Sequence, residues 1–400
     1  MELHGKRTDP YRVLFPFGIL IGIAGVSIWP AYYFGLTAGY SGRAHAFVQI
    51  EGFVYAFVAG FLLTAIPRFT GTEAPGRTAQ FILAGLILSS AAAFEFQIER
   101  AGHIGFLIAH VFVITLVASR YARKRNPPPE TFPLVGLGLL AGLIGGTVNA
   151  AIAWQALEPS FDLLGKRLLT EGMLLLLVLG IGSFLGPRLM GFAQIPDFEK
   201  MGRLAGKTGL SFLERNQSYI LALTGAAIIA SLIAEYRFQL GWAAYLRAAL
   251  ATAIIAAKIH PWRLPAVRTT LAWCVWMSFL FLLFGLWISA AAPPYRVDFL
   301  HIVFIGSFTL LILAVGTRVA LSHGGHSLSA EQRSWVLRIG AAAVIIAMFS
   351  RAGAPFAAES FFEHLAIAAL LWIAALAVWG YYVMGLLRRD PKGSGSRSSK

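Results

Sequence analysis

Histidines are the residues of this chain best suited to metal chemistry. Nine are present among 400 residues, and five lie in strongly apolar runs. These five are His45, His103, His110, His301 and His364. Imidazole is a common ligand of haem iron and of copper, so several imidazoles at one depth of a membrane favour a shared cofactor. A single histidine in a membrane helix is more often a hydrogen-bonding group between helices, and we assign that role first to His110.

Distances along the chain place the candidate ligands at a similar depth. His45 lies 23 residues before Arg68, His301 lies 17 residues before Arg318, and His364 falls near the depth of His45. At about 1.5 Å per helical residue, all three lie in the outer half of a membrane. We therefore predict a haem bound axially by His45 and His301, or by His45 and His364.

Two other histidines stand at the opposite side of the predicted bundle. His323 ends an apolar run in a Gly-Gly turn, and His260 lies in a neighbouring loop. Together they could bind a second metal ion, copper being the candidate. The simpler alternative is that His323 caps the negative end of its helix. The only cysteine is Cys274, which excludes an internal disulfide and any CxxC site.

The elements that position these residues are membrane-spanning helices. The chain is 57% apolar and 13% charged, with a mean hydropathy of +0.69, whereas soluble domains are about 45–50% apolar and 25% charged. A span needs roughly 20 apolar residues, and no period-two alternation indicates a barrel. We predict an all-α polytopic membrane protein with twelve spans, at 13–36, 45–66, 78–98, 103–120, 132–156, 168–186, 218–236, 241–258, 267–290, 297–320, 333–350 and 358–386.

The basic residues predict the orientation. With the N-terminus inside, the inner segments carry 25 Lys and Arg and the outer segments carry 7, as the positive-inside rule requires. The net charge of +14 is thus a feature of topology and not a nucleic-acid footprint. We expect a cytoplasmic tail at 1–12, the bundle at 13–387, and a flexible cytoplasmic tail at 388–400 in a bacterial inner membrane.

The second and sixth spans share a motif. Glu51-Gly52 and Glu171-Gly172 are each followed at the same spacings by a glycine and by Pro-Arg, with an offset of 120 residues. The tenth span matches more weakly at an offset of 250, where His301 takes the place of Glu51. Three four-helix repeats around a threefold axis would explain this pattern, and coincidence among glycine-rich helices is the alternative.

Buried charges are the second chemical signal. Glu51, Glu171 and Arg247 lie within predicted spans, where an ionisable group suggests function. The glutamates could orient a ligand histidine, serve a proton path, or pair structurally with Arg247. As an alternative to haem binding, the same three residues fit a metal-free secondary transporter. A structural or sensory protein with histidines as polar contacts is a third hypothesis.

Two stretches resemble the signatures of the NnrS family. The first runs from His45 to Gly52 and continues through Ala59–Gly71. The second is Leu300–Gly325, in which a histidine precedes a glycine-containing helix and Arg-Val-x-Leu-x-His-x-Gly. The resemblance covers most of the chain. One departure is that Phe47 and Val48 stand where the family often has a second histidine and a glutamate.

The resemblance carries functional implications. NnrS proteins are bacterial inner-membrane proteins described as containing haem and copper. They are associated with nitric oxide metabolism and denitrification, and they protect against nitrosative stress. The family motif transfers to His45, His301, Arg318 and His323. We therefore expect the partners to be nitric oxide or its iron and thiol adducts, membrane lipid and a periplasmic electron donor, with no nucleic acid.

Overall fold

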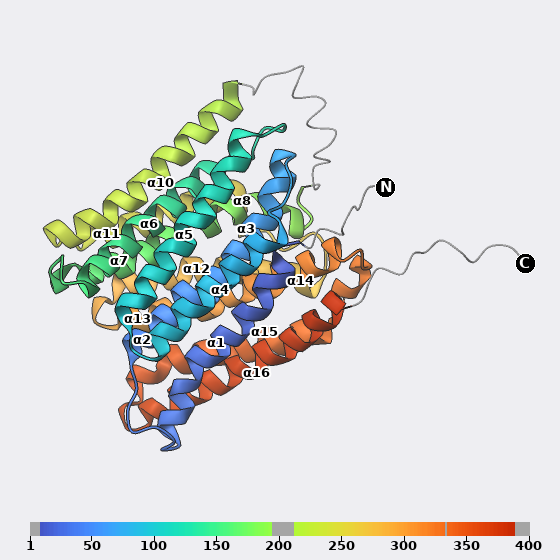
Figure 1. Ribbon diagram of the computed structural model, residues 1–400. Coiled ribbons are helices and arrows are strands. Elements are labelled where there is room, and N and C mark those ends of the chain that lie inside the picture. Colours follow the sequence, from blue (N-terminus) through green and yellow to red (C-terminus); the bar gives the residue numbers. More distant parts are fainter. Residues whose placement is uncertain (1–8, 194–211, 333, 389–400) are drawn as a thin grey trace, which may run out of the picture.

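The computed structural model describes residues 9–193, 212–332 and 334–388 (Figure 1). Within these ranges every regular element is a helix and no strand occurs. The predicted all-α class is therefore confirmed. Most of the two predicted tails, residues 1–8 and 389–400, lies outside the described residues.

Twelve helical rods, some made of successive segments, run along one common direction (Figure 1). Eleven of these rods are long and apolar enough to cross a membrane, and the twelfth, α11, has 17 residues. The described chain is thus a multi-pass membrane protein. The main helices are α1 (Tyr11–Tyr33), α2 (Gly42–Phe47), α3 (Tyr55–Thr70), α4 (Arg77–Glu95), α5 (Glu99–Ala122), α6 (Phe132–Ala153), α7 (Asp162–Arg167), α8 (Leu175–Leu189), α10 (Phe212–Phe238), α11 (Trp242–Lys258), α12 (Thr270–Ala291), α13 (Arg296–His301), α14 (Leu310–His323), α15 (Trp335–Gly353) and α16 (Phe361–Arg388).

Three of the rods contain a π-helical segment. The segments η1 (Val48–Val54), η3 (Leu168–Leu174) and η5 (Ile302–Thr309) each follow a six-residue α-helix and precede a longer one. In a π-helix each turn holds an extra residue, and such turns are frequent at functional sites. Five short 3₁₀ segments, η2 (Pro159–Phe161), η4 (Pro293–Tyr295), η6 (Leu328–Glu331), η7 (Ala354–Phe356) and η8 (Ala358–Ser360), precede or follow the main helices.

Glycine lets neighbouring helices approach η1 closely. A Cβ atom on Gly52 would lie 2.7 Å from the side chain of Ile21 in α1, which is closer than two carbon atoms can pack. Small residues at such positions are a general means of packing helices in membranes, where lipid gives little hydrophobic drive for association. The motif glycine that follows Glu51 thus has a packing role.

Helix contacts follow one order through three consecutive sets of four rods. In each set the first rod packs on the second, the second on the third, and the third on the fourth. The sets join through α5 with α6, α11 with α12, and α16 with α1, which closes a ring. This order is what the four-helix repeat hypothesis requires, and the hypothesis itself stays a prediction.

The third rod of this kind is shorter than the sequence motif suggested. The π segments begin 120 and 254 residues after η1, whereas Arg318 follows Arg68 by 250 residues. The segment between η5 and Arg318 is therefore four residues shorter than its counterpart in α3. An alignment on arginines alone pairs His301 with Glu51, while the backbone pairs Ile305 with Glu51.

The two ends of the described chain meet. A guanidinium nitrogen of Arg12, at the start of α1, donates to the carbonyl of Leu387, near the end of α16, at 3.0 Å. Both ends therefore lie on one side of the bundle, which agrees with an even number of crossings. We call this side the arginine end, because α3, α8 and α14 finish there with Arg68, Arg188 and Arg318. The opposite side is the histidine end.

Candidate functional site

His45 is held at the histidine end by the short helix α2. Ser41 caps this helix, and its hydroxyl accepts a hydrogen bond from the amide of Ala44. The Nδ1 atom of His45 lies 2.7 Å from the carbonyl oxygen of Gly25 in α1. Trp29 packs edge-on against the imidazole, with ring centroids 5.3 Å apart. The ring therefore has a fixed orientation, set by backbone and by an aromatic neighbour.

His301 has the same kind of anchor. Its Nδ1 atom lies 2.7 Å from the carbonyl oxygen of Val297, one turn earlier in α13. The ring packs against Phe304, with centroids 5.8 Å apart. His45 lies close enough to His301 for the two side chains to interact electrostatically, and Arg351 interacts with both. The structure thus brings these two predicted ligands into one region.

The anchors decide which nitrogen is available. A carbonyl oxygen is only an acceptor, so Nδ1 of His45 and of His301 must carry the proton of the neutral ring. The lone pair is then on Nε2, which is the form in which a histidine binds a metal. Hydrogen bonding of the other ring nitrogen to a carbonyl is the usual support of a metal-ligating histidine. The donor chemistry therefore fits an axial ligand of haem iron.

His364 starts α16 at the same end and has a different environment. Its Nδ1 atom lies 3.2 Å from the hydroxyl of Ser350 in α15. The same hydroxyl donates to the carbonyl of His364 at 2.9 Å. This contact joins α15 and α16, so the side chain has a packing role beside its predicted ligand role.

The other predicted site residues lie at the arginine end. Arg318 pairs with Glu331 at 3.1 Å. His323 lies 3.8 Å from Asp9 and packs edge-on against Tyr11, whereas His260 packs against Trp262. Within the described ranges, no three His, Cys, Asp or Glu side chains converge on one point.

Distance separates the two groups of predicted ligands. His301 and Arg318 are 17 residues apart on one rod, or roughly 25 Å at 1.5 Å per residue. One haem on His301 therefore cannot also contact Arg318. Near His323, burial raises the pKa of Asp9, although Arg68 and Arg12 act to lower it. A protonated Asp9 would leave Arg68 and His323 without a full countercharge.

Glu171 lies in a buried network of five charges. Arg247 donates through Nε to Glu171 at 2.9 Å, which confirms the predicted pairing. Arg296 donates to both oxygens of the same carboxylate, at 2.9 and 3.0 Å. Glu235 accepts from Arg247 at 2.8 Å and from Arg167 at 3.0 Å. Three guanidinium groups and two carboxylates thus satisfy one another, as buried charges must.

Sequence reasoning missed half of this network. Arg167 and Arg296 were counted as loop residues, and Glu235 falls at the end of a predicted span. The signal that could have found them is an acid within an apolar run, because an unpaired one is too costly to bury. The network has a structural reading, which removes the buried pair Glu171 and Arg247 from the argument for a transporter.

Glu51 has a different partner. Its Oε1 atom lies 3.4 Å from Nδ1 of His103 in α5, and both side chains are fully buried. Among the described residues, neither carboxylate oxygen and neither ring nitrogen has a hydrogen bond of good geometry. Phe47 and Phe94 pack edge-on against the imidazole. A titratable pair thus lies in an apolar enclosure.

His110 behaves as expected for a polar contact between helices. Its Nδ1 atom lies 3.0 Å from the hydroxyl of Tyr55, and its Nε2 atom lies 2.8 Å from the carbonyl of Leu139. Both ring nitrogens are occupied, so no lone pair is free for a metal.

A comparison with protein families now identifies the chain. The model of the NnrS family, described as "NnrS protein", matches residues 7–390. The chain belongs to the NnrS family. This match confirms the resemblance seen in His45–Gly52, Ala59–Gly71 and Leu300–Gly325, and it spans all twelve rods. No curated protein matches the sequence. NnrS membership connects the described bundle to a family linked with haem and copper.

Proposed function

We propose that this NnrS protein binds haem between His45 and His301 at the histidine end and thereby handles nitric oxide or its iron and thiol adducts. One observation carries the proposal. Two histidines from different rods, in electrostatic range of one another, each have Nδ1 fixed on a backbone carbonyl at 2.7 Å. This arrangement leaves two Nε2 lone pairs for one iron.

The chain's own residues prepare this site. The Gly25 and Val297 carbonyls hold the imidazoles neutral and oriented, so no reorientation is needed on binding. Asp298 accepts from Arg351 at 2.7 Å and partly neutralises the cation that interacts with both histidines. The haem would supply an iron that binds nitric oxide when one axial position is open, and that transfers electrons when both are filled.

Copper enters only through family membership. His260 and His323 have separate neighbours, and the described residues offer no cluster of three ligands. His364 is the alternative partner of His45 for the haem iron, although its Ser350 contact ties it to α15. We propose the bacterial inner membrane as the location, with both termini cytoplasmic, so that the histidine end faces periplasmic electron donors.

The test is the absorption spectrum of the detergent-purified protein. A haem band is expected for the unmodified chain, and its loss is expected in His45→Ala and in His301→Ala. His110→Ala is the matched control, because this histidine is buried but has both nitrogens bonded. It should keep the haem band.

Two outcomes would contradict the proposal. One is a correctly folded protein with no haem after expression in cells supplied with haem precursor. The other is a haem band that survives the double variant His45→Ala with His301→Ala. If the band survives in that double variant but is lost in His364→Ala, the ligand set is wrong.

A further inference from the structure

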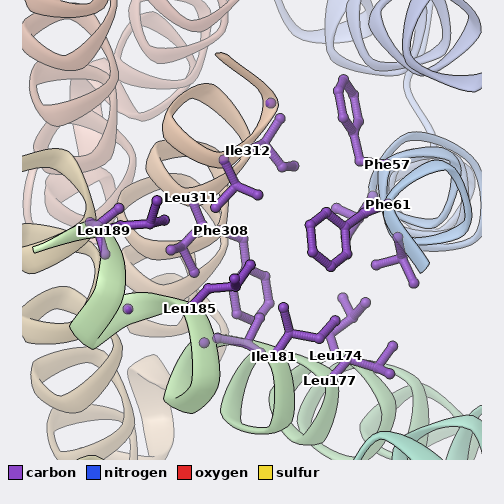
Figure 2. Close-up of a pocket in the computed structure, with 18 of the residues that line it drawn as sticks. Phe57, Phe61, Leu174, Leu177, Ile181, Leu185, Leu189, Phe308, Leu311 and Ile312 are labelled. Atoms are coloured by element: carbon purple, nitrogen blue, oxygen red, sulfur yellow. The ribbon is translucent and has the colours of Figure 1, made fainter. Parts of the chain in front are cut away.

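A cavity lies inside the bundle where the three π-containing rods meet. Its volume is about 120 Å³. Figure 2 shows Phe57 and Phe61 from α3, Ile181 and Leu185 from α8, and Ile312 from α14 around one space. All twenty lining residues are apolar or glycine.

The lining residues occupy matching positions on the three rods. Val54, Leu174 and Phe308 are the last or next-to-last residues of the three π segments, displaced by 120 and 254 residues. Val58, Val178 and Ile312 follow four residues later with the same displacements. Two further positions on each rod obey the same rule. The cavity is therefore formed by one side-chain pattern used three times.

Size and polarity decide what such a space can hold. Pockets for drug-sized ligands or cofactors have volumes of about 300–1,000 Å³ and include placed polar groups. This cavity is smaller and offers no hydrogen bond to water. An engineered cavity of about 150 Å³ lined by Leu, Ile and Phe stays dry and binds benzene or xenon. By this comparison the space suits small neutral apolar molecules.

A row of rings leads from the cavity toward the histidine end. Phe308 lines the cavity, and its ring centroid lies 6.0 Å from that of Phe304. Phe304 in turn lies 5.8 Å from the ring of His301. These three side chains follow one face of α13 and η5. The cavity thus lies two ring contacts from the proposed haem ligand.

We propose that this central cavity is a binding site for small apolar gas molecules of the xenon and diatomic size class. Nitric oxide belongs to this class, and its role as the natural occupant rests on the proposed function. Lipid favours such molecules over water, so a cavity within the bundle can take them up from the membrane. Phe304 then separates the stored molecule from His301.

Xenon is the probe that tests the site without haem chemistry. Crystals of the full chain under xenon pressure should show an anomalous peak among Val58, Val178 and Ile312. Each of the variants Val58→Phe, Val178→Phe and Ile312→Phe fills part of the space and should lower the xenon occupancy at least twofold. Phe61→Ala enlarges the space and should raise it.

Ile346→Phe is the matched control. Ile346 is 55% exposed on α15 and does not line the cavity, so this variant should keep the peak. Absence of xenon from the unmodified chain would overturn the proposal, as would ordered water or an acyl chain in the unpressurised map. Xenon binding in a protein without haem would leave this site intact and refute the proposed function alone.

Discussion

Glu51 and Glu171 occupy the same position in two π-helical segments and have opposite surroundings. Glu171 accepts hydrogen bonds from Arg247 and Arg296 within a five-membered ionic network. Glu51 lies beside His103, at 3.4 Å, within a shell of aromatic rings. One backbone feature thus buries an acid twice, once as part of a structural lock and once as an unsatisfied group.

The contrast shows that the scaffold and the chemistry of this bundle are separable. Buried polar atoms without partners are rare, and each one calls for a bound water, an ion or a functional role. The Glu171 network needs no such explanation, because its groups satisfy one another. The Glu51–His103 pair does need one, and it lies next to the rods that carry the haem-ligand candidates.

The largest effect is expected from the network. Glu171→Gln leaves two buried guanidinium groups with less than their full countercharge, and breaking a buried pair in this way costs about 3–5 kcal/mol. The free energy of unfolding in mixed detergent micelles measures it. Glu171→Gln combined with Arg247→Met should recover part of the loss, since the orphaned charge is removed. A single variant as stable as the unmodified protein would contradict the structural reading.

A smaller effect is expected from the corresponding change in the first unit. Glu51→Gln keeps the shape of the side chain and removes a group that has no guanidinium partner, so stability should change by about 1 kcal/mol or less. The same unfolding measurement applies. A loss equal to that of Glu171→Gln would mean that the Glu51–His103 contact is a strong ion pair and would erase the comparison.

The smallest effect is expected at the edge of the bundle. Arg43 binds Glu99 at 2.7 Å and also Asp162, and all three side chains are partly exposed. Exposed pairs contribute about 0.2–1 kcal/mol and are screened by salt. Glu99→Gln should therefore cost at most about 1 kcal/mol, and less in 1 M salt. Glu171→Gln should keep its full cost at that salt concentration.

Much of the fold was predictable because lipid imposes a simple rule on composition. The rods begin and end within a few residues of most predicted spans. The largest misses are the starts of the sixth and seventh spans. The sixth starts at α7, whose Asp162, Lys166 and Arg167 fell outside the apolar window. Those charges are neutralised by Arg43, Asp162 and Glu235 of this and other elements, which a hydropathy count cannot see.

Side-chain partners were predictable only where charge left few choices. Arg247 is a cation within a predicted span, and its pairing with Glu171 was anticipated. The pairing of Glu51 with His103 was not, because no rule of spacing connects the second rod with the fourth. The π segments were also invisible, since their residues carry no special sequence signal. Each π segment rotates the helix that succeeds it, so the three segments decide which residues of α3, α8 and α14 face the cavity.

The contact between Arg12 and Leu387 has a consequence for how the chain is ordered. A closed circle of helices has no natural first member, and its beginning is only the point at which the polypeptide was cut. Because both cut ends lie at one side, the order of the three sets along the sequence carries no geometric information. Each set has the same two neighbours that it would have if the chain had started elsewhere.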